Sequence, residues 1–216
     1  MGAQEGLGAG RGVMAVAIAL LWLVLALPAV AGEMTDRVRG ELDQVAAVVK
    51  DPTLQGPTKE AERKARVRHL ILGWFDVKEM ARRSLAGHWA KQSEPERKEF
   101  SEMFGDLFVE SYTRLVVDHL GDQRVVYLSE AADGQAATVR TKFLSKRDEP
   151  TFVDFSLFLR DGLWAAYDVV IDDVSIVGTY RTQFGKIIRT QSYEALVKKM
   201  RLKHEAEGLG SAAKGR

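Results

Sequence analysis

The stretch from Trp164 to Phe184 changes its hydrophobic period partway along, and this change constrains the fold more than any other feature of the chain. Up to Ile171 the residues alternate, with Tyr167, Val169 and Ile171 on one side, as in a β-strand with a buried face. From Val174 onward the apolar residues follow the spacing of an amphipathic helix. A strand that leads almost directly into such a helix needs a second apolar layer close by, so this stretch predicts a sheet covered by helices.

The first half of the chain is expected to be helical. The periodic segments span residues 34–50, 58–74, 77–85 and 93–120. Thr35 is a candidate cap for the first helix. Ser93 and Glu96 have the spacing of a capping box at the start of the longest helix. That helix carries a stripe of Phe and other apolar residues, which is typical of a core-facing surface.

After Gly121 the pattern changes to strands joined by short turns. The expected strands span residues 124–129, 136–145, 151–160 and 163–172. Their connections are short enough for hairpins, which predicts an antiparallel meander with one apolar face and one solvated face. Helices that begin near Ser175 and Ser192 then close the chain.

The N-terminal 31 residues have the pattern of a secretory signal peptide. Arg11 precedes an apolar run over residues 13–27, and Ala29-Val30-Ala31 provides the small residues of a cleavage site. We therefore expect cleavage after Ala31; an uncleaved membrane anchor is the alternative. The expected folded domain spans residues 32–205, with helices over about 34–120 and the sheet and closing helices over about 121–205. Residues 206–216, rich in Gly, Ala and Ser, are expected to be disordered.

Composition excludes several classes of function. The chain has 31 basic and 30 acidic residues, a net charge of +1, so it lacks the basic excess of a nucleic-acid-binding domain. It has no cysteine, which excludes disulfides, thiol nucleophiles and cysteine zinc sites. The motifs of common hydrolases and metalloproteases are absent, and the four histidines lie without metal-ligand spacing. We therefore predict no catalytic residue and no metal site.

Asp168 is the most unusual polar residue, because it lies among apolar neighbours in the last long strand. A carboxylate in such surroundings requires a partner. One interpretation makes it a general base in a pocket; the other makes it a structural ion pair with Arg82 or Arg181 that joins helix and sheet, and we favour the ion pair.

Four segments resemble the MlaC, or toluene-tolerance (Ttg2-type), family of periplasmic lipid-binding proteins. They are FDVKEMARRSLAGHW at residues 75–89, SEPE at 93–96, YDVVI at 167–171 and YRTQF at 180–184. The resemblance extends over about residues 34–205, in order and after a signal peptide. Gly178-Thr179 departs from the family pattern at the entrance to the helix.

The resemblance implies an α+β fold in which a curved antiparallel sheet of four to five strands, similar to that of NTF2, packs against several helices and encloses an apolar cavity. It also implies a soluble, monomeric periplasmic carrier, without a cofactor, whose cargo is a phospholipid. The implied partners are an outer-membrane lipoprotein–porin complex and an inner-membrane ABC transporter complex with an MCE domain, a system that maintains outer-membrane lipid asymmetry. Three alternatives stay open: a carrier of another lipid such as a hopanoid, an NTF2-like enzyme for a hydrophobic substrate, and a chaperone-like periplasmic factor.

The residues expected to line the cavity come from the long helix, from the apolar sheet face and from the closing helix. They are Phe104, Phe108, Tyr112, Val139, Thr141, Phe143, Val153, Phe155, Leu157, Tyr167, Val169, Ile171, Val174, Val177, Tyr180 and Phe184. The sequence leaves open which lipid is bound, how many acyl chains are held, the direction of transport and the partner surfaces.

Overall fold

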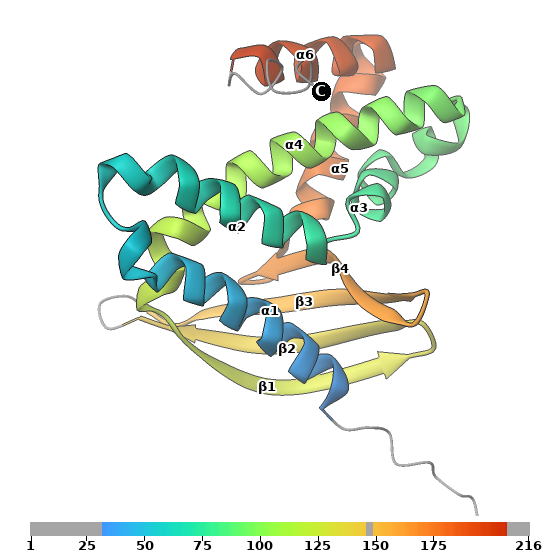
Figure 1. Ribbon diagram of the computed structural model, residues 1–216. Helices are drawn as coiled ribbons and strands as arrows, with labels where there is room; N and C mark the ends of the chain where they lie inside the picture. Colours follow the sequence, from blue (N-terminus) through green and yellow to red (C-terminus); the bar gives the residue numbers. More distant parts are fainter. Residues whose placement is uncertain (1–31, 146–148, 207–216) are drawn as a thin grey trace, which may run out of the picture.

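Helices cover one face of a five-stranded antiparallel sheet, and the opposite face is left open (Figure 1). The computed structural model describes residues 32–145 and 149–206. The predicted signal peptide and nearly all of the predicted disordered tail lie outside these residues. Within the described residues, the predicted α+β class and the predicted antiparallel meander are confirmed.

The strands follow one another through the sheet in chain order, β1-β2-β3-β4-β5. Their bounds are β1 Arg124–Asp133, β2 Ala136–Leu144, β3 Thr151–Arg160, β4 Leu163–Ile171 and β5 Val174–Ser175. Five strands agree with the expected four to five, but the hydrophobic pattern did not identify the short β5. It occupies positions expected to begin the closing helix, so Val174 is an exposed strand residue instead of a helical one.

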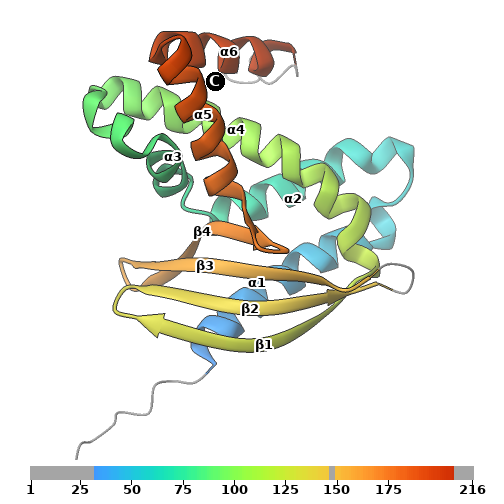
Figure 2. The ribbon, with the colours of Figure 1, turned by 180° about the vertical axis from the view of Figure 1, so that it is seen from behind.

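The α-helices have bounds close to those expected from the sequence. They are α1 Glu33–Lys50, α2 Glu60–Trp74, α3 Val77–Leu85, α4 Glu94–His119, α5 Ile176–Thr190 and α6 Tyr193–Ala206. Short 3₁₀ turns occupy Pro52–Leu54, Pro57–Lys59, Ala86–Lys91 and Leu120–Asp122. α1 crosses the sheet, α2 and α4 lie above it, and α5 rises from the β4 edge to α6 (Figures 1 and 2).

Helix α1 begins differently from the prediction. Gly32, and not Thr35, occupies its N-cap position. The side chain of Glu130, on β1, accepts hydrogen bonds from the backbone N–H groups of Gly32 and Thr35 at 2.5 and 2.8 Å. A carboxylate nearly one hundred residues away thus satisfies donors that a local cap would otherwise satisfy. The predicted capping box of α4 is present, since Ser93 N and Oγ both lie 2.7 Å from Glu96 Oε2.

A β-bulge in β4 changes which of its side chains face the helices. Leu157 pairs with Ala166, whereas Ser156 pairs with Asp168, so Tyr167 is the extra residue. The bulge shifts the alternation by one position. As a result Trp164 and Ala166 share the covered face with Val169 and Ile171. The prediction that Tyr167 lies on the face of Val169 and Ile171 is therefore wrong.

Tyr167 instead packs beneath the guanidinium of Arg83, from α3, whose Cζ lies 3.8 Å from the ring centroid. The backbone next to it closes the sheet edge: Phe75 forms a parallel bridge with Ala166, and Asp76 N donates to the Ala166 carbonyl at 2.8 Å. The α2–α3 corner is thereby joined directly to β4.

Helix α4 forms the centre of the core. Phe100, Phe104 and Phe108 recur at four-residue spacing, are at most 2% exposed, and form a stacked ladder along one side of the helix. Phe184 of α5 packs edge-on against Phe100 and Phe104. The α4–α5 contact is therefore aromatic and closely packed.

Gly105 allows α3 and α4 to approach each other. A Cβ at this position would lie 2.7 Å from Val77 Cγ1. We expect Gly105→Ala to lower the free energy of unfolding by about 1–3 kcal/mol, because overpacking outweighs the gain in helix propensity. Urea denaturation would measure this change.

Gly40 provides the matched control, since it is an exposed residue within α1 and a Cβ there meets nothing within 4 Å. Gly40→Ala should be neutral or stabilise by up to about 1 kcal/mol. Val77→Ala should rescue much of the loss in Gly105→Ala. A Gly105→Ala protein with unchanged stability would show that the close approach does not constrain the fold.

Candidate functional site

An apolar cavity of about 480 Å³ lies between the sheet and the helices. Its walls come from α1, α2, α4 and the start of α5 on the helical side, and from β2, β3 and β4 on the sheet side. The lining residues are Leu42, Val45, Ile71, Trp74, Phe75, Phe108, Tyr112, Leu115, Val116, His119, Leu120, Gln123, Phe143, Glu149, Thr151, Val153, Phe155, Val169, Ile171 and Ile176. Pockets of this size and character are typical of sites for small apolar ligands.

The cavity is polar and exposed at one end and apolar at the other. His119, Gln123 and Glu149 belong to the end of α4, the turn after it and the β2–β3 connection, and His119 and Glu149 are exposed. Leu115, also on the lining, is 46% exposed. These residues define the mouth. An amphipathic ligand would be placed with its polar end there.

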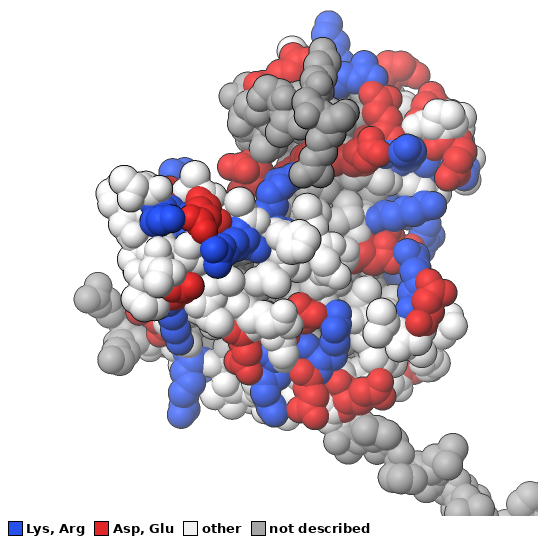
Figure 3. All heavy atoms as spheres, viewed as in Figure 1, with Lys and Arg blue, Asp and Glu red and all other residues white. Residues whose placement is uncertain are grey.

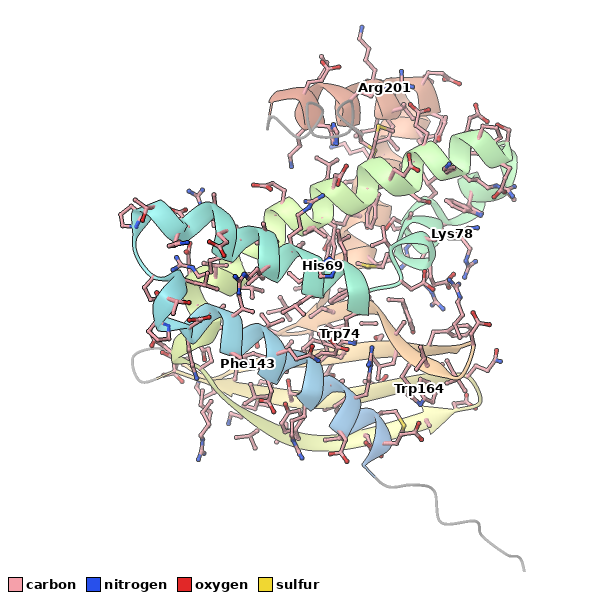
Figure 4. The ribbon with its side chains drawn as sticks, viewed as in Figure 1. His69, Trp74, Lys78, Phe143, Trp164 and Arg201 are labelled. Atoms are coloured by element: carbon pink, nitrogen blue, oxygen red, sulfur yellow. The ribbon has the colours of Figure 1, made fainter. Side chains whose placement is uncertain are left out.

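Four aromatic residues form the floor. The ring centroids of Trp74 and Phe155 lie 5.2 Å apart, those of Trp74 and Phe75 5.0 Å, and those of Phe75 and Phe108 5.2 Å. Trp74, Phe108 and Phe155 are each at most 4% exposed. Trp74 lies between α2 and the sheet, whereas Phe143 lies towards the opposite end of α1 from Trp164 (Figure 4). These rings offer a ligand a continuous apolar surface.

The part of the lining that the structure describes carries no fixed positive charge. None of the described residues that line it is Lys or Arg, and Glu149 is the one acidic residue among them. Burial raises the pKa of Tyr112 to about 12, and the nearby Tyr180 and Asp168 contribute to the shift. Tyr112 therefore stays neutral at physiological pH. The outer surface is mixed in charge: basic and acidic side chains are interspersed over the face shown in Figure 3.

The structure brings seven of the sixteen residues expected at the cavity onto its lining. They are Phe108, Tyr112, Phe143, Val153, Phe155, Val169 and Ile171. Val139, Thr141 and Leu157 are fully buried elsewhere on the covered face of the sheet. Phe104, Val177, Tyr180 and Phe184 belong to the packed contact around α4 and α5 instead. Tyr167 lies under Arg83 and Val174 is 60% exposed.

Sequence reasoning missed the contribution of α1 and α2. Leu42 and Val45 from α1, and Ile71, Trp74 and Phe75 from α2, all line the cavity. Each belongs to the apolar side of its segment in the sequence, but the helical period alone does not distinguish a residue of the cavity wall from a residue of the packed core. The helix end at Trp74-Phe75, two aromatic residues directly before a turn, is the signal that marks the floor.

Asp168 is not in an ion pair with Arg82 or Arg181. Its carboxylate accepts hydrogen bonds from the backbone N–H groups of Val169 and Val177 and from Ser175 Oγ, at 2.9, 3.0 and 2.5 Å. Arg82 instead donates two hydrogen bonds to the carboxylate of Glu79, in a bidentate ion pair. The carboxylate therefore joins β4 to the first turn of α5, and it does not line the cavity. Hydrogen bonding replaces the expected cation, as is common for a carboxylate near a helix N-terminus.

Metal-ligand clusters and membrane-spanning helices are both absent from residues 32–145 and 149–206. No group of three or more His, Asp or Glu residues in these ranges could hold a metal ion. No helix in them is both long enough and apolar enough to span a membrane.

Fold and cavity together define an α+β protein with an internal site for an apolar ligand. The sequence profile of the family described as MlaC protein matches residues 40–202. This match covers most of the chain, so the chain belongs to the MlaC family. The family resemblance inferred from the sequence is confirmed.

A solved structure supports the same fold. It is the phospholipid-binding protein from Ralstonia solanacearum, determined in complex with a phospholipid at 1.53 Å. The alignment covers 79% of this chain and 96% of that one, with a TM-score of 0.69 and 21% sequence identity. At this identity the similarity establishes the fold. No match was found among the curated proteins.

The hydrogen bonds of Asp168 lead to a prediction about stability. Asp168→Asn keeps an acceptor oxygen but loses the charge that holds Ser175 Oγ and the N-terminus of α5. We expect a loss of about 1–3 kcal/mol in the free energy of unfolding. Asp173 is an exposed turn residue with φ 65°, and Asp173→Asn is the control. Its free energy of unfolding should stay within about 0.5 kcal/mol of that of the parent. Equal stability of parent and Asp168→Asn would contradict the structural role.

Proposed function

We propose that this protein is a periplasmic carrier that holds the acyl chains of a phospholipid in the cavity between sheet and helices. The observation that carries this proposal is the apolar cavity of about 480 Å³ with an aromatic floor and a polar mouth. Membership of the MlaC family supports it, as does the phospholipid bound by the Ralstonia solanacearum protein.

The energetics suit retention of a lipid by apolar contact. Removing a methylene from water is worth about 0.8 kcal/mol, so two chains of about sixteen carbons contribute roughly 20 kcal/mol before costs are subtracted. A charged clamp for the head group is not required. This agrees with a lining whose polar side chains at the mouth are His119, Gln123 and Glu149, and in which Lys and Arg are absent among the described residues.

The same energetics make spontaneous release slow. A lipid can leave at a useful rate only where another apolar environment receives it. We therefore propose that the protein exchanges lipid between an outer-membrane lipoprotein–porin complex and an inner-membrane ABC transporter complex with an MCE domain, with ATP hydrolysed by the transporter. Family membership is the support for these partners, and the secretory pattern of residues 1–31 is the support for a periplasmic location.

An enzymatic role for Asp168 is not favoured. Its three hydrogen bonds leave the carboxylate occupied with backbone and hydroxyl donors, and it lies away from the cavity lining. A general base must reach a proton on the substrate. The site is therefore better suited to binding than to catalysis.

Native mass spectrometry of the protein purified from a Gram-negative host tests the proposed function. We expect a complex with the mass of the chain plus a phospholipid, and lipid extraction under denaturing conditions should identify the lipid. A hopanoid in place of the phospholipid would keep the carrier role and change the cargo. The bare chain mass in repeated preparations would contradict the proposal.

Adjacent valines on β4 provide a matched pair of variants. Val169 lines the cavity and is 8% exposed, whereas Val170 lies against an outer groove with Phe152 and Asp172. Val169→Phe should lower lipid occupancy at least about tenfold, since the added ring displaces two or more methylenes. Val170→Phe should leave occupancy unchanged. Equal occupancy in both variants, with both proteins folded, would place the lipid elsewhere.

A further inference from the structure

The carboxylate of Glu130 forms an unusual contact with the first residues that the structure describes, at the start of α1. Oε1 accepts a hydrogen bond from the backbone N–H of Gly32, with an N···O distance of 2.5 Å, and Oε2 accepts one from the backbone N–H of Thr35, at 2.8 Å. These bonds hold the pKa of Glu130 below its usual range, although partial burial opposes the shift. Glu130 is thus ionised and bound to neutral donors, namely two backbone amides and the Thr35 side chain.

A β-bulge in β1 orients the side chain of Glu130 towards the start of α1. Tyr127 pairs with Thr141 and Ser129 pairs with Arg140, so Leu128 is an extra residue in β1. The bulge shifts the later residues by one place, and Glu130 pairs with the fully buried Val139 on the covered face. Without it, Glu130 would point to the solvated face. The distortion leaves Leu128 49% exposed.

The described residues give Glu130 no cationic side chain as a partner. The two nearby arginines of α1 form ion pairs with other residues: Arg37 with Glu41 at 2.8 Å and Arg39 with Asp36 at 3.2 Å. A partly buried carboxylate without a cation is a position where a positive charge would be stabilising.

The sequence places a source of positive charge at this point. The Ala29-Val30-Ala31 pattern predicts cleavage of the peptide bond between Ala31 and Gly32. Hydrolysis adds one water: the hydroxyl goes to the Ala31 carbonyl, which leaves as a carboxylate, and Gly32 N becomes an amine. With an ordinary pKa of about 8, that amine is protonated at neutral pH. The donor already 2.5 Å from Glu130 Oε1 would then be an ammonium.

We propose that Glu130 is the binding site for the amino terminus that cleavage after Ala31 creates. Processing converts a hydrogen bond between a carboxylate and a neutral amide into an ion pair and fixes α1 to β1. Because Leu42 and Val45 of α1 line the cavity, the ion pair also fixes one cavity wall. The inference is independent of which lipid is bound.

A double-mutant cycle tests the proposal. Four proteins are compared by urea denaturation at pH 7 and low salt: a chain beginning at Gly32, released from a fusion without extra residues; the same chain with two alanines before Gly32; and Glu130→Gln in each. Glu130→Gln keeps one acceptor oxygen and weakens the helix cap in both backgrounds, but it removes the ion pair in only one. The folding equilibrium constant should therefore fall about fivefold to tenfold more in the chain that begins at Gly32. Equal losses would overturn the proposal and leave Glu130 as a cap only.

A second measurement does not depend on the stability of a variant. The pKa of the Gly32 amine, followed by NMR in the parent, should lie roughly one unit above the value of about 8 expected for a free terminus. Asp133→Asn, an exposed acid at the end of the same strand, is the control and should leave this pKa unchanged. An unshifted pKa in the folded parent would overturn the proposal. So would a mature N-terminus, sequenced from the exported protein, that begins at another residue.

Discussion

The bulge at Tyr167 is the local distortion on which much of the architecture depends. It places Trp164 and Ala166 on the same face as Val169 and Ile171, so that β4 is apolar towards the helices along its whole length. The following residue, Asp168, then reaches the first turn of α5 and fixes the direction in which the chain leaves the sheet. A regular strand would turn half of these apolar side chains to solvent.

The cavity follows from how the helices cover this face. At one end the Phe ladder of α4 packs closely against α5, with Phe104, Tyr180 and Phe184 in mutual ring contact. Towards the other end α4 passes over the sheet beside α1 and α2, and its side chains line a space instead of filling it. An unfilled apolar space is costly to a protein that has no use for it. Occupation by acyl chains would recover the lost contacts.

The sequence predicted the elements of the fold well and the wall of the cavity in part. Helices and strands followed from their hydrophobic periods, and the family resemblance followed from motifs around Met80, Tyr167 and Phe184. The bulges at Leu128 and Tyr167 were not predictable, because an extra residue looks like ordinary alternation until the partner strand is known. For the same reason the face of Tyr167 was misassigned. The contributions of Leu42 and Trp74 depend on helix packing, which a single helical period does not contain.

The position of the acyl chains is the central claim, and quenching of Trp74 fluorescence tests it most directly. The chain beginning at Gly32, with Trp89 and Trp164 replaced by phenylalanine, would contain Trp74 as its one tryptophan. Phospholipids brominated at successive positions along the acyl chain would then be bound in turn. Because Trp74 lies in the floor and the polar groups lie at the mouth, quenching should be greatest for bromines near the chain terminus. Strongest quenching by bromines next to the head group, or no quenching by a bound lipid, would contradict the account.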